Sequence, residues 1–200
     1  MGMTTKVASW LLLVLCCSQS LAGEIGAHPS GIKPLKAPPR GGDFTLESVR
    51  GPVSTTEFRG KVIMLYFGYT RCPDVCPTSF SLMAQALNEL DEKELERVVG
   101  LFVSVDPERD TVARLADYVS YFHPSFIGLT GSQSAVAYAA EAYGVQYGFT
   151  DASDSAMGYI VNHSAAIYLI DRQGKLRFAF PHETPPETLL GAIRMLLERD

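Results

Sequence analysis

Two apolar runs constrain the fold of this chain more than any other feature of its sequence. Residues 62–67 (VIMLYF) and 98–105 (VVGLFVSV) lack the alternation of a half-exposed strand, so both predict strands that are buried on both faces. Between them, residues 77–95 carry apolar side chains at helical spacing. A buried strand, a helix and a second buried strand are typical of a sheet that helices cover on both faces.

Strands and helices continue to alternate along the rest of the chain. The other expected elements are a hairpin of residues 44–49 and 53–58, helices at 111–122, 132–143 and 186–198, a strand at 126–129, extended segments at 145–149 and 159–161, and a second hairpin of 165–170 and 175–180. This order predicts an α/β protein with a central mixed sheet, helices on both faces and an N-terminal β-hairpin.

The composition excludes one class of partner. The 200 residues carry a net charge of −5, and the 17 Lys and Arg residues are spread along the chain rather than clustered. A nucleic-acid-binding surface requires a basic patch, so nucleic acid is not an expected partner.

The N-terminal segment predicts export. Lys6 precedes an apolar run at residues 7–17, and the small residues Ser20 and Ala22 suit cleavage after position 22. Residues 1–22 therefore read as a signal peptide and the proline- and glycine-rich residues 23–42 as a linker, leaving residues 43–200 as the domain. An uncleaved membrane anchor and a lipoprotein are the alternatives, and the bacterial periplasm is the expected location.

Cys72 and Cys76 are the cysteines that remain after such cleavage. Pro77 suits the first position of a helix, so both thiols are expected at the positive end of the helix dipole, where the pKa of a thiol falls. A purely structural disulfide across three intervening residues would constrain the unfolded chain little. The pair therefore predicts reactive or metal-binding sulfur.

His163 is the candidate third member of this site. The spacing of Cys72 and Cys76 is one residue wider than in thioredoxin-type redox motifs, so two thiolates can spread around one ion. Soft sulfur selects Cu(I) or zinc, and imidazole suits copper as well as zinc. His163 directly precedes a strand expected to begin beside the cysteine loop; the alternative is a histidine satisfied by backbone contacts.

Other polar residues fit ordinary roles. His28 lies in the linker, His123 at a helix end and His182 in a turn. Asp106 leaves two interpretations open: a helix-start cluster in which Asp110 is the N-cap, or a supporting role near the metal.

These motifs strongly resemble the Sco/SenC family of copper-binding, thioredoxin-fold proteins that assist assembly of cytochrome c oxidase. The resemblance covers residues 43–198 and rests on three segments: residues 66–77 (YFGYTRCPDVCP), 104–110 (SVDPERD) and 162–164 (NHS). It implies a thioredoxin-like fold and a copper ion held by Cys72, Cys76 and His163. It also implies delivery to the binuclear copper site of oxidase subunit II, with another periplasmic copper chaperone as a second candidate partner.

The chain departs from the family pattern at two places. Asn162 stands where the family often has Asp, which removes a negative charge beside His163. Members are commonly anchored in a membrane by an N-terminal helix, so membrane association through the N-terminus stays open here.

Two other activities remain open beside the copper chaperone. In a thiol-disulfide oxidoreductase, Cys72 and Cys76 would be the redox-active pair that reduces client cysteines. The wide cysteine spacing and Ala165, which stands where such reductases place a proline, argue against reduction as the sole function. A thiol peroxidase is the third hypothesis, and whether the chain is an enzyme stays open.

Overall fold

The computed structural model describes residues 40–155 and 157–198, together with residue 1. The predicted signal peptide, His28 and most of the predicted linker lie outside the described residues. Within the described part, no helix is both long enough and apolar enough to cross a membrane.

A five-stranded mixed sheet forms the centre of the domain. Its strand order is β5 (Phe126–Leu129), β4 (Val98–Ser104), β3 (Val62–Gly68), β8 (Ala166–Ile170) and β9 (Leu176–Pro181). The first three strands pair in parallel, and β8 and β9 join them antiparallel. Every residue of β3 and β4 is buried, which confirms the prediction made from the two apolar runs.

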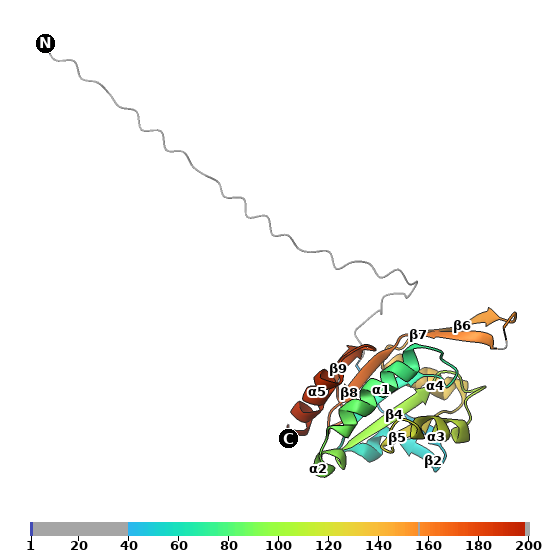
Figure 1. The fold of residues 1–200 in the computed structure, drawn as a ribbon, viewed down its shortest axis with the longest axis horizontal. Helices are drawn as coiled ribbons and strands as arrows, with labels where there is room; N and C mark the ends of the chain where they lie inside the picture. The colour runs from blue at the N-terminus through green and yellow to red at the C-terminus, as the bar shows by residue number, and fades with distance from the viewer. Residues whose placement is uncertain (2–39, 156, 199–200) are drawn as a thin grey trace. The chain divides into compact units, whose positions relative to one another are not determined.

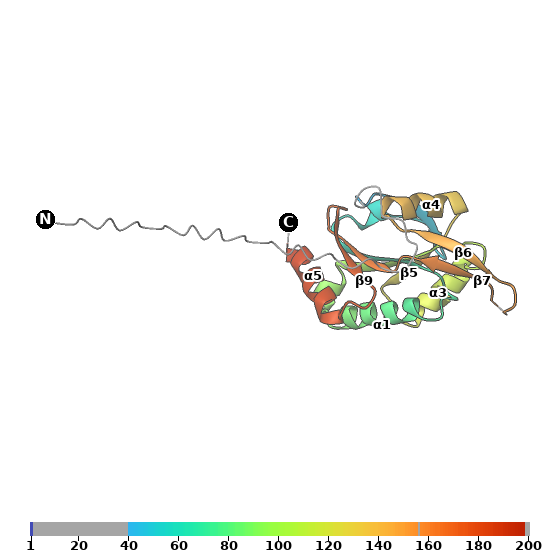
Figure 2. The same cartoon turned by 90° about the horizontal axis from the view of Figure 1, so that it is seen from above.

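Helices cover both faces of this sheet (Figures 1 and 2). Three of them pack on one face: α1 (Val75–Asn88), α3 (Val112–Ser120) and α5 (Pro186–Glu198). The other face is covered by α4 (Gln133–Ala142) and by β1 (Thr45–Ser48). The expected α/β architecture with two covered faces is therefore confirmed.

The N-terminal hairpin is shorter than expected. β1 pairs with β2 (Gly51–Ser54), and the chain then turns into the short helix η1 (Thr55–Phe58). The prediction of a strand over residues 55–58 was wrong because Ser54 and Glu57 form a capping box. The Ser54 amide donates to Glu57 Oε1 at 2.8 Å, and such a box starts a helix.

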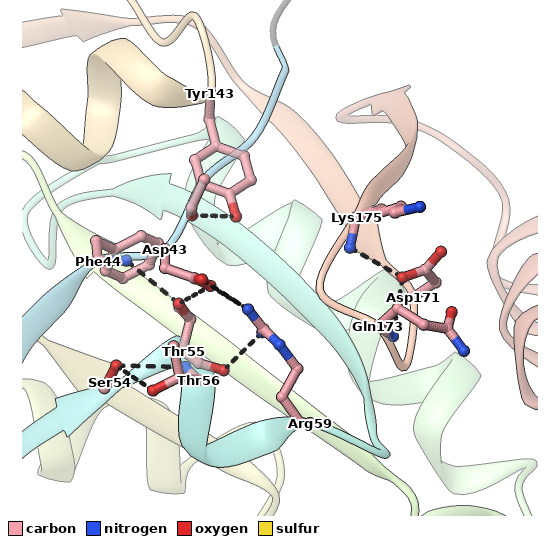
Figure 3. Close-up of polar contacts among 11 residues, drawn as sticks. Asp43, Phe44, Ser54, Thr55, Thr56, Arg59, Tyr143, Asp171, Gln173 and Lys175 are labelled. Atoms are coloured by element: carbon pink, nitrogen blue, oxygen red, sulfur yellow. Dashed lines mark hydrogen bonds and ion pairs between the residues drawn. The ribbon is translucent and has the colours of Figure 1, made fainter.

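Polar contacts tie the start of β1 to η1 (Figure 3). Arg59 Nη2 donates to both carboxylate oxygens of Asp43, at 2.7 and 2.6 Å, and this bond lowers the pKa of Asp43. Thr55 Oγ1 donates to the same carboxylate at 3.0 Å. The Tyr143 hydroxyl donates to the carbonyl oxygen of Gly42 at 3.0 Å, so α4 also holds this end of the domain.

The helix expected over residues 77–95 is two helices. α1 begins at Val75, two residues before the predicted start, so Pro77 is the third helical residue rather than the first. The position still suits proline because amides of the first turn have no partner within the helix. α2 (Glu92–Leu95) is separate, and Asp91 and Glu94 form its capping box.

β6 (Tyr147–Ala152) and β7 (Gly158–His163) form a separate two-stranded antiparallel sheet. Residues 147–149 of the expected segment at 145–149 and all of the segment at 159–161 belong to this hairpin, which extends beyond the central sheet (Figures 1 and 2). Tyr147 pairs with His163 and Phe149 with Val161, so these four side chains share one face. The hairpin therefore ends at the histidine of the candidate site.

Candidate metal centre

Three elements bring the predicted donors together. Cys72 lies in the loop between β3 and α1, Cys76 in the first turn of α1, and His163 at the last position of β7. The two sulfur atoms and one imidazole nitrogen all lie within 4.8 Å of one another. Cys76 Sγ is 3.5 Å from His163 Nε2. Residues 87 positions apart thus meet at one point.

A glycine allows α1 to start close to β3. A Cβ atom on Gly68 would lie 2.6 Å from the Cys76 sulfur, a contact too close for any side chain to make. The absence of a side chain at the end of β3 therefore lets Cys76 sit, fully buried, against the central strand. Cys72, by contrast, is partly exposed.

Asp110 fixes the cysteine loop through hydrogen bonds. Its buried carboxylate accepts hydrogen bonds from the Thr70 amide at 2.9 Å, from the Thr70 hydroxyl and from the Ser104 hydroxyl at 2.7 Å. Its predicted role as the N-cap of the next helix was wrong, because Thr111 caps α3 by accepting from the Arg114 amide. Two residues before Cys72, the loop is thus fixed to the end of β4.

The imidazole of His163 is oriented by a main-chain contact. Its Nδ1 lies 3.2 Å from the carbonyl oxygen of Ser164. A carbonyl can only accept, so Nδ1 carries the proton in this hydrogen bond. Nε2 is therefore the ring nitrogen that faces the sulfur atoms and is left to act as a metal ligand.

Two tyrosines pack around this ring. Tyr66 and Tyr69 present edge-on contacts to His163, with ring centroids at 6.3 and 5.9 Å. Both tyrosines are buried. The sequence does not reveal that they pack on the imidazole, although their place beside the cysteine loop was a signal that they lie near the site.

The two thiols have pKa shifts of opposite direction. The Cys76 thiol hydrogen-bonds to Cys72 and lowers the pKa of Cys72 to about 4, against the effect of burial; His163 and backbone groups of α1 lower it further. The same bond raises the pKa of Cys76, as do burial and the negative charge on Cys72. The expectation that the helix dipole lowers the pKa of both thiols was therefore wrong for Cys76. Cys72 is the thiolate, and Cys76 retains its proton.

The donor set fits a soft metal ion. Donors bonded to one ion at about 2.0–2.3 Å in a plane lie about 3.5–4 Å from one another. The 3.5 Å separation of Cys76 Sγ and His163 Nε2 is already in this range. Two sulfurs and one imidazole nitrogen suit Cu(I) or zinc. Binding would displace the proton of Cys76, since the metal ligand is the thiolate.

The other two histidines that the structure describes, His123 and His182, do not belong to this group of donors. His123 is buried after α3, where its Nδ1 accepts a hydrogen bond from the Ser125 amide at 3.1 Å, and burial lowers its pKa. His182 belongs to no group of metal-binding side chains among the described residues. The contacts of His123 agree with the structural role expected from its place at a helix end.

Asp106 lies outside the group of donors and contacts the hairpin that carries His163. It forms an ion pair with Arg109 and accepts a hydrogen bond from the Tyr159 hydroxyl at 2.7 Å. Tyr159 thus has a polar contact as well as its ring contacts. No local pattern in the sequence singled out Arg109. Asn162 donates to Thr150 Oγ1 on the face of the hairpin opposite to His163. Its side chain therefore points away from the donors.

Comparison with known proteins identifies related sequences. The SCO1/SenC family model matches residues 33–198. The mitochondrial SCO2 homolog of Mus musculus is 41% identical over 155 residues, which are 76% of this chain and 60% of that protein. A SCO2-like protein of Rickettsia felis is 33% identical over 185 residues, covering 92% of this chain and 87% of the relative.

Solved structures confirm the thioredoxin-like fold. ScoI of Bradyrhizobium japonicum, solved with copper bound, is 36% identical with a TM-score of 0.71, covering 78% of this chain and 99% of that one. Yeast Sco1, also solved with copper bound, is 33% identical with a TM-score of 0.73, covering 82% and 91%. The family model, the relatives and the shared fold agree, and this chain belongs to the SCO1/SenC family.

Proposed function

We propose that this protein binds copper through Cys72, Cys76 and His163 and delivers it to the binuclear copper site of cytochrome c oxidase subunit II during assembly. The observation that carries the proposal is the convergence of two sulfurs and one imidazole nitrogen within 4.8 Å. Copper rather than zinc is supported by the relatives that were solved with copper bound.

The role in oxidase assembly is supported at the level of the family. BsSco is described as a member of the Sco family of cytochrome c oxidase assembly proteins, and at 22% identity it shares the fold with this chain. Subunit II as the client, and a second periplasmic copper chaperone as the donor of copper, are proposals that extend the family resemblance.

The geometry suits transfer as well as binding. Three protein donors leave room around Cu(I) for a ligand from the client. Cys72 is partly exposed while Cys76 is buried, so the client would approach from the side of Cys72. The proton of Cys76 leaves when copper binds and returns when copper is passed on.

Copper stoichiometry and ligand spectroscopy on the reduced full chain test this function. We expect about one Cu(I) per chain, with sulfur and imidazole nitrogen seen by X-ray absorption, because the part of the chain that the structure describes holds one such group of three donors. Cys72→Ser, Cys76→Ser and His163→Ala should each weaken binding, and His182→Ala is the matched control. Full copper binding by the chain that lacks both thiols would contradict the proposal.

Delivery needs a separate measurement. The copper-loaded chain is mixed with the reduced, copper-free copper domain of subunit II, and the metal content of each protein is measured after separation. Copper should move to the client domain. If this chain retains all of its copper although the client domain binds free copper, the proposal of delivery is wrong and only the proposal of copper binding stands.

A second candidate function is the reduction of client disulfides. The Cys72 thiolate beside the protonated Cys76 favours it, since the thiolate can attack a disulfide and form a mixed disulfide with release of one client thiolate. Cys76, after losing its proton, then displaces the second client thiolate and closes the Cys72–Cys76 bond. Reduction that survives His163→Ala in a chain without copper affinity would favour this function.

We also propose that the protein acts outside the cytoplasm, in the bacterial periplasm. Its relatives include a SCO1/SenC family lipoprotein of Bacillus anthracis, 27% identical with a TM-score of 0.65. A fusion to a reporter enzyme that is active only after export tests the location, and loss of reporter activity on deletion of residues 1–22 is the expected result.

A further inference from the structure

Arg109 connects the loop after β4 to the hairpin that carries His163. Its Nη1 donates to two carbonyl oxygens of the hairpin, Met157 at 2.8 Å and Tyr159 at 3.0 Å. Its Nε donates to the carboxylate of Asp106 on its own loop. One side chain thus joins two segments about 50 residues apart in sequence, with the loop's carboxylate on one side and the strand's main chain on the other.

Tyr159, on the hairpin, contacts both Asp106 and Arg109. Its hydroxyl donates to Asp106 Oδ1 at 2.7 Å, and the guanidinium carbon of Arg109 lies 3.5 Å from the centroid of its ring. Asp106 is 1% exposed and the side chain of Arg109 is 12% exposed, so these contacts are largely removed from solvent. Ion pair, stacking and hydrogen bonds support one another in this setting.

The connection leads along β7 to the imidazole. Tyr159 and His163 lie on the same face of β7 and are separated by Val161. The Tyr69 hydroxyl hydrogen-bonds to the backbone of Val161, and the Tyr69 ring packs edge-on against His163. Arg109 also lies over Tyr69, 5.8 Å from its ring centroid. The position of His163 therefore depends on how firmly the preceding residues of β7 are held.

A hairpin of this kind needs such support. Two strands alone are marginally stable in water, and much of β6 and β7 is exposed. The sulfur donors belong to the central sheet and α1, whereas the imidazole belongs to the hairpin. Small shifts of the hairpin would change the distance between Nε2 and the sulfurs.

We propose that Arg109 is a positioning residue of the metal centre: with Asp106 and Tyr159 it clamps β7 and holds His163 Nε2 at the distance from the two sulfurs that copper requires. The inference rests on the proposed copper function and names the group that sets the geometry of that site. It acts through His163, so its effect must vanish when His163 is absent.

Arg109→Lys is the decisive variant. Lysine keeps the charge opposite Asp106, so no buried carboxylate is left without a cation, but its single ammonium cannot reproduce the fork and the planar stacking. Arg114→Lys, at an exposed position on α3, is the matched control. Tyr159→Phe is the second variant. It removes only the hydroxyl bonded to Asp106 and keeps the ring, so it tests the clamp even if the lysine variant folds poorly.

The first measurement is Cu(I) affinity of the reduced full chain, in parent and His163→Ala backgrounds. Arg109→Lys should lower the affinity about 10-fold or more, the usual effect of losing a group that orients a ligand. Tyr159→Phe should lower it less, and Arg114→Lys should not change it. In the His163→Ala background, Arg109→Lys should have no further effect. An equal loss in both backgrounds, or no loss in either, would overturn the proposal.

The second measurement uses no copper. In the reduced copper-free chain, nuclear Overhauser effects between the rings of His163 and Tyr69 should be present in the parent and in Arg114→Lys, and weakened in Arg109→Lys. Unchanged effects in Arg109→Lys and in Tyr159→Phe would overturn the positioning role. If the parent binds no copper and these effects are nevertheless lost, the copper function fails and the positioning of His163 by Arg109 stands.

Discussion

Cys76 and His163 lie 3.5 Å apart, yet the parts of the molecule that carry them are held in different ways. Cys76 is fully buried between α1 and a strand whose every residue is buried. His163 is partly exposed at the end of a two-stranded sheet, where Phe149 is 51% exposed. The fold of the domain as a whole thus fixes the sulfur side of the site, whereas a few specific contacts fix the imidazole side.

The largest expected difference is in folding stability. Phe80, on α1, is fully buried and contacts Phe102 and Phe126 with ring centroids at 4.9 and 5.0 Å. Phe80→Ala should lower the free energy of unfolding by about 3–5 kcal/mol because it leaves a cavity in this aromatic cluster. Urea denaturation of the reduced chain measures the change. A loss below about 1 kcal/mol would show that the side carrying the sulfurs is no more rigid than the hairpin.

Asp110→Asn should have the next largest effect, and it acts where the cysteine loop is joined to the end of β4. The amide of asparagine would place a donor among groups that donate to the carboxylate, from Thr70 and Ser104. We expect a loss of about 1–3 kcal/mol in unfolding free energy, since buried donors lose their acceptor. Urea denaturation measures it, with Asp117→Asn at an exposed position of α3 as the control. Equal stability of the two variants would contradict the role of the Asp110 carboxylate in holding the cysteine loop.

The pKa of Cys72 gives a third test of the sulfur side. Because the folded pKa is about 4, below the ordinary value of a thiol, Cys72 is a thiolate at neutral pH and loses this form only as pH falls through about 4. The rate of alkylation at Cys72 should therefore stay nearly constant from pH 8 to pH 6. In Cys76→Ala, which has no side-chain donor at this position, the rate should begin to fall at a higher pH. Mass spectrometry of the quenched reaction measures both. A parallel fall in the two proteins would contradict the role of Cys76.

The smallest effect is expected on the hairpin. Phe149→Ala removes an exposed ring that contacts Tyr147 and Tyr159, at 6.2 and 5.5 Å between centroids. The free energy of unfolding should change by less than about 0.5 kcal/mol, as for most surface substitutions. The same denaturation experiment measures it. A loss near that of Phe80→Ala would show that the hairpin belongs to the cooperative core and would remove the contrast between the two sides.

Local sequence patterns predicted the elements that depend on burial. β3 and β4 were readable because a strand covered on both faces must be apolar at nearly every position. Helix starts that depend on capping residues were predicted less well. Ser54 with Glu57 started a helix within a predicted strand, and Asp91 with Glu94 started α2 inside a predicted continuous helix. Both are capping boxes, so the signal was present in the sequence and was missed.

Roles that depend on distant contacts could not be read from the sequence. Nothing near Arg109 shows that it binds the carbonyl oxygens of Met157 and Tyr159. The opposite pKa shifts of Cys72 and Cys76 arise because one thiol is buried deeper and donates to the other. The dipole of a helix acts on both thiols alike, so position on the helix alone does not tell them apart.

The contact between His163 Nδ1 and the carbonyl oxygen of Ser164 does not depend on which side chain stands at position 164. The acceptor belongs to the main chain, which every amino acid provides, so replacement of the side chain at position 164 leaves the choice of imidazole tautomer intact. Only a change in the direction of the backbone could reverse that choice. Substitution of the neighbouring side chain therefore leaves Nε2 as the nitrogen that faces the metal site. The ring contacts of Tyr66 and Tyr69, in contrast, are made by side chains and are lost when those residues are replaced.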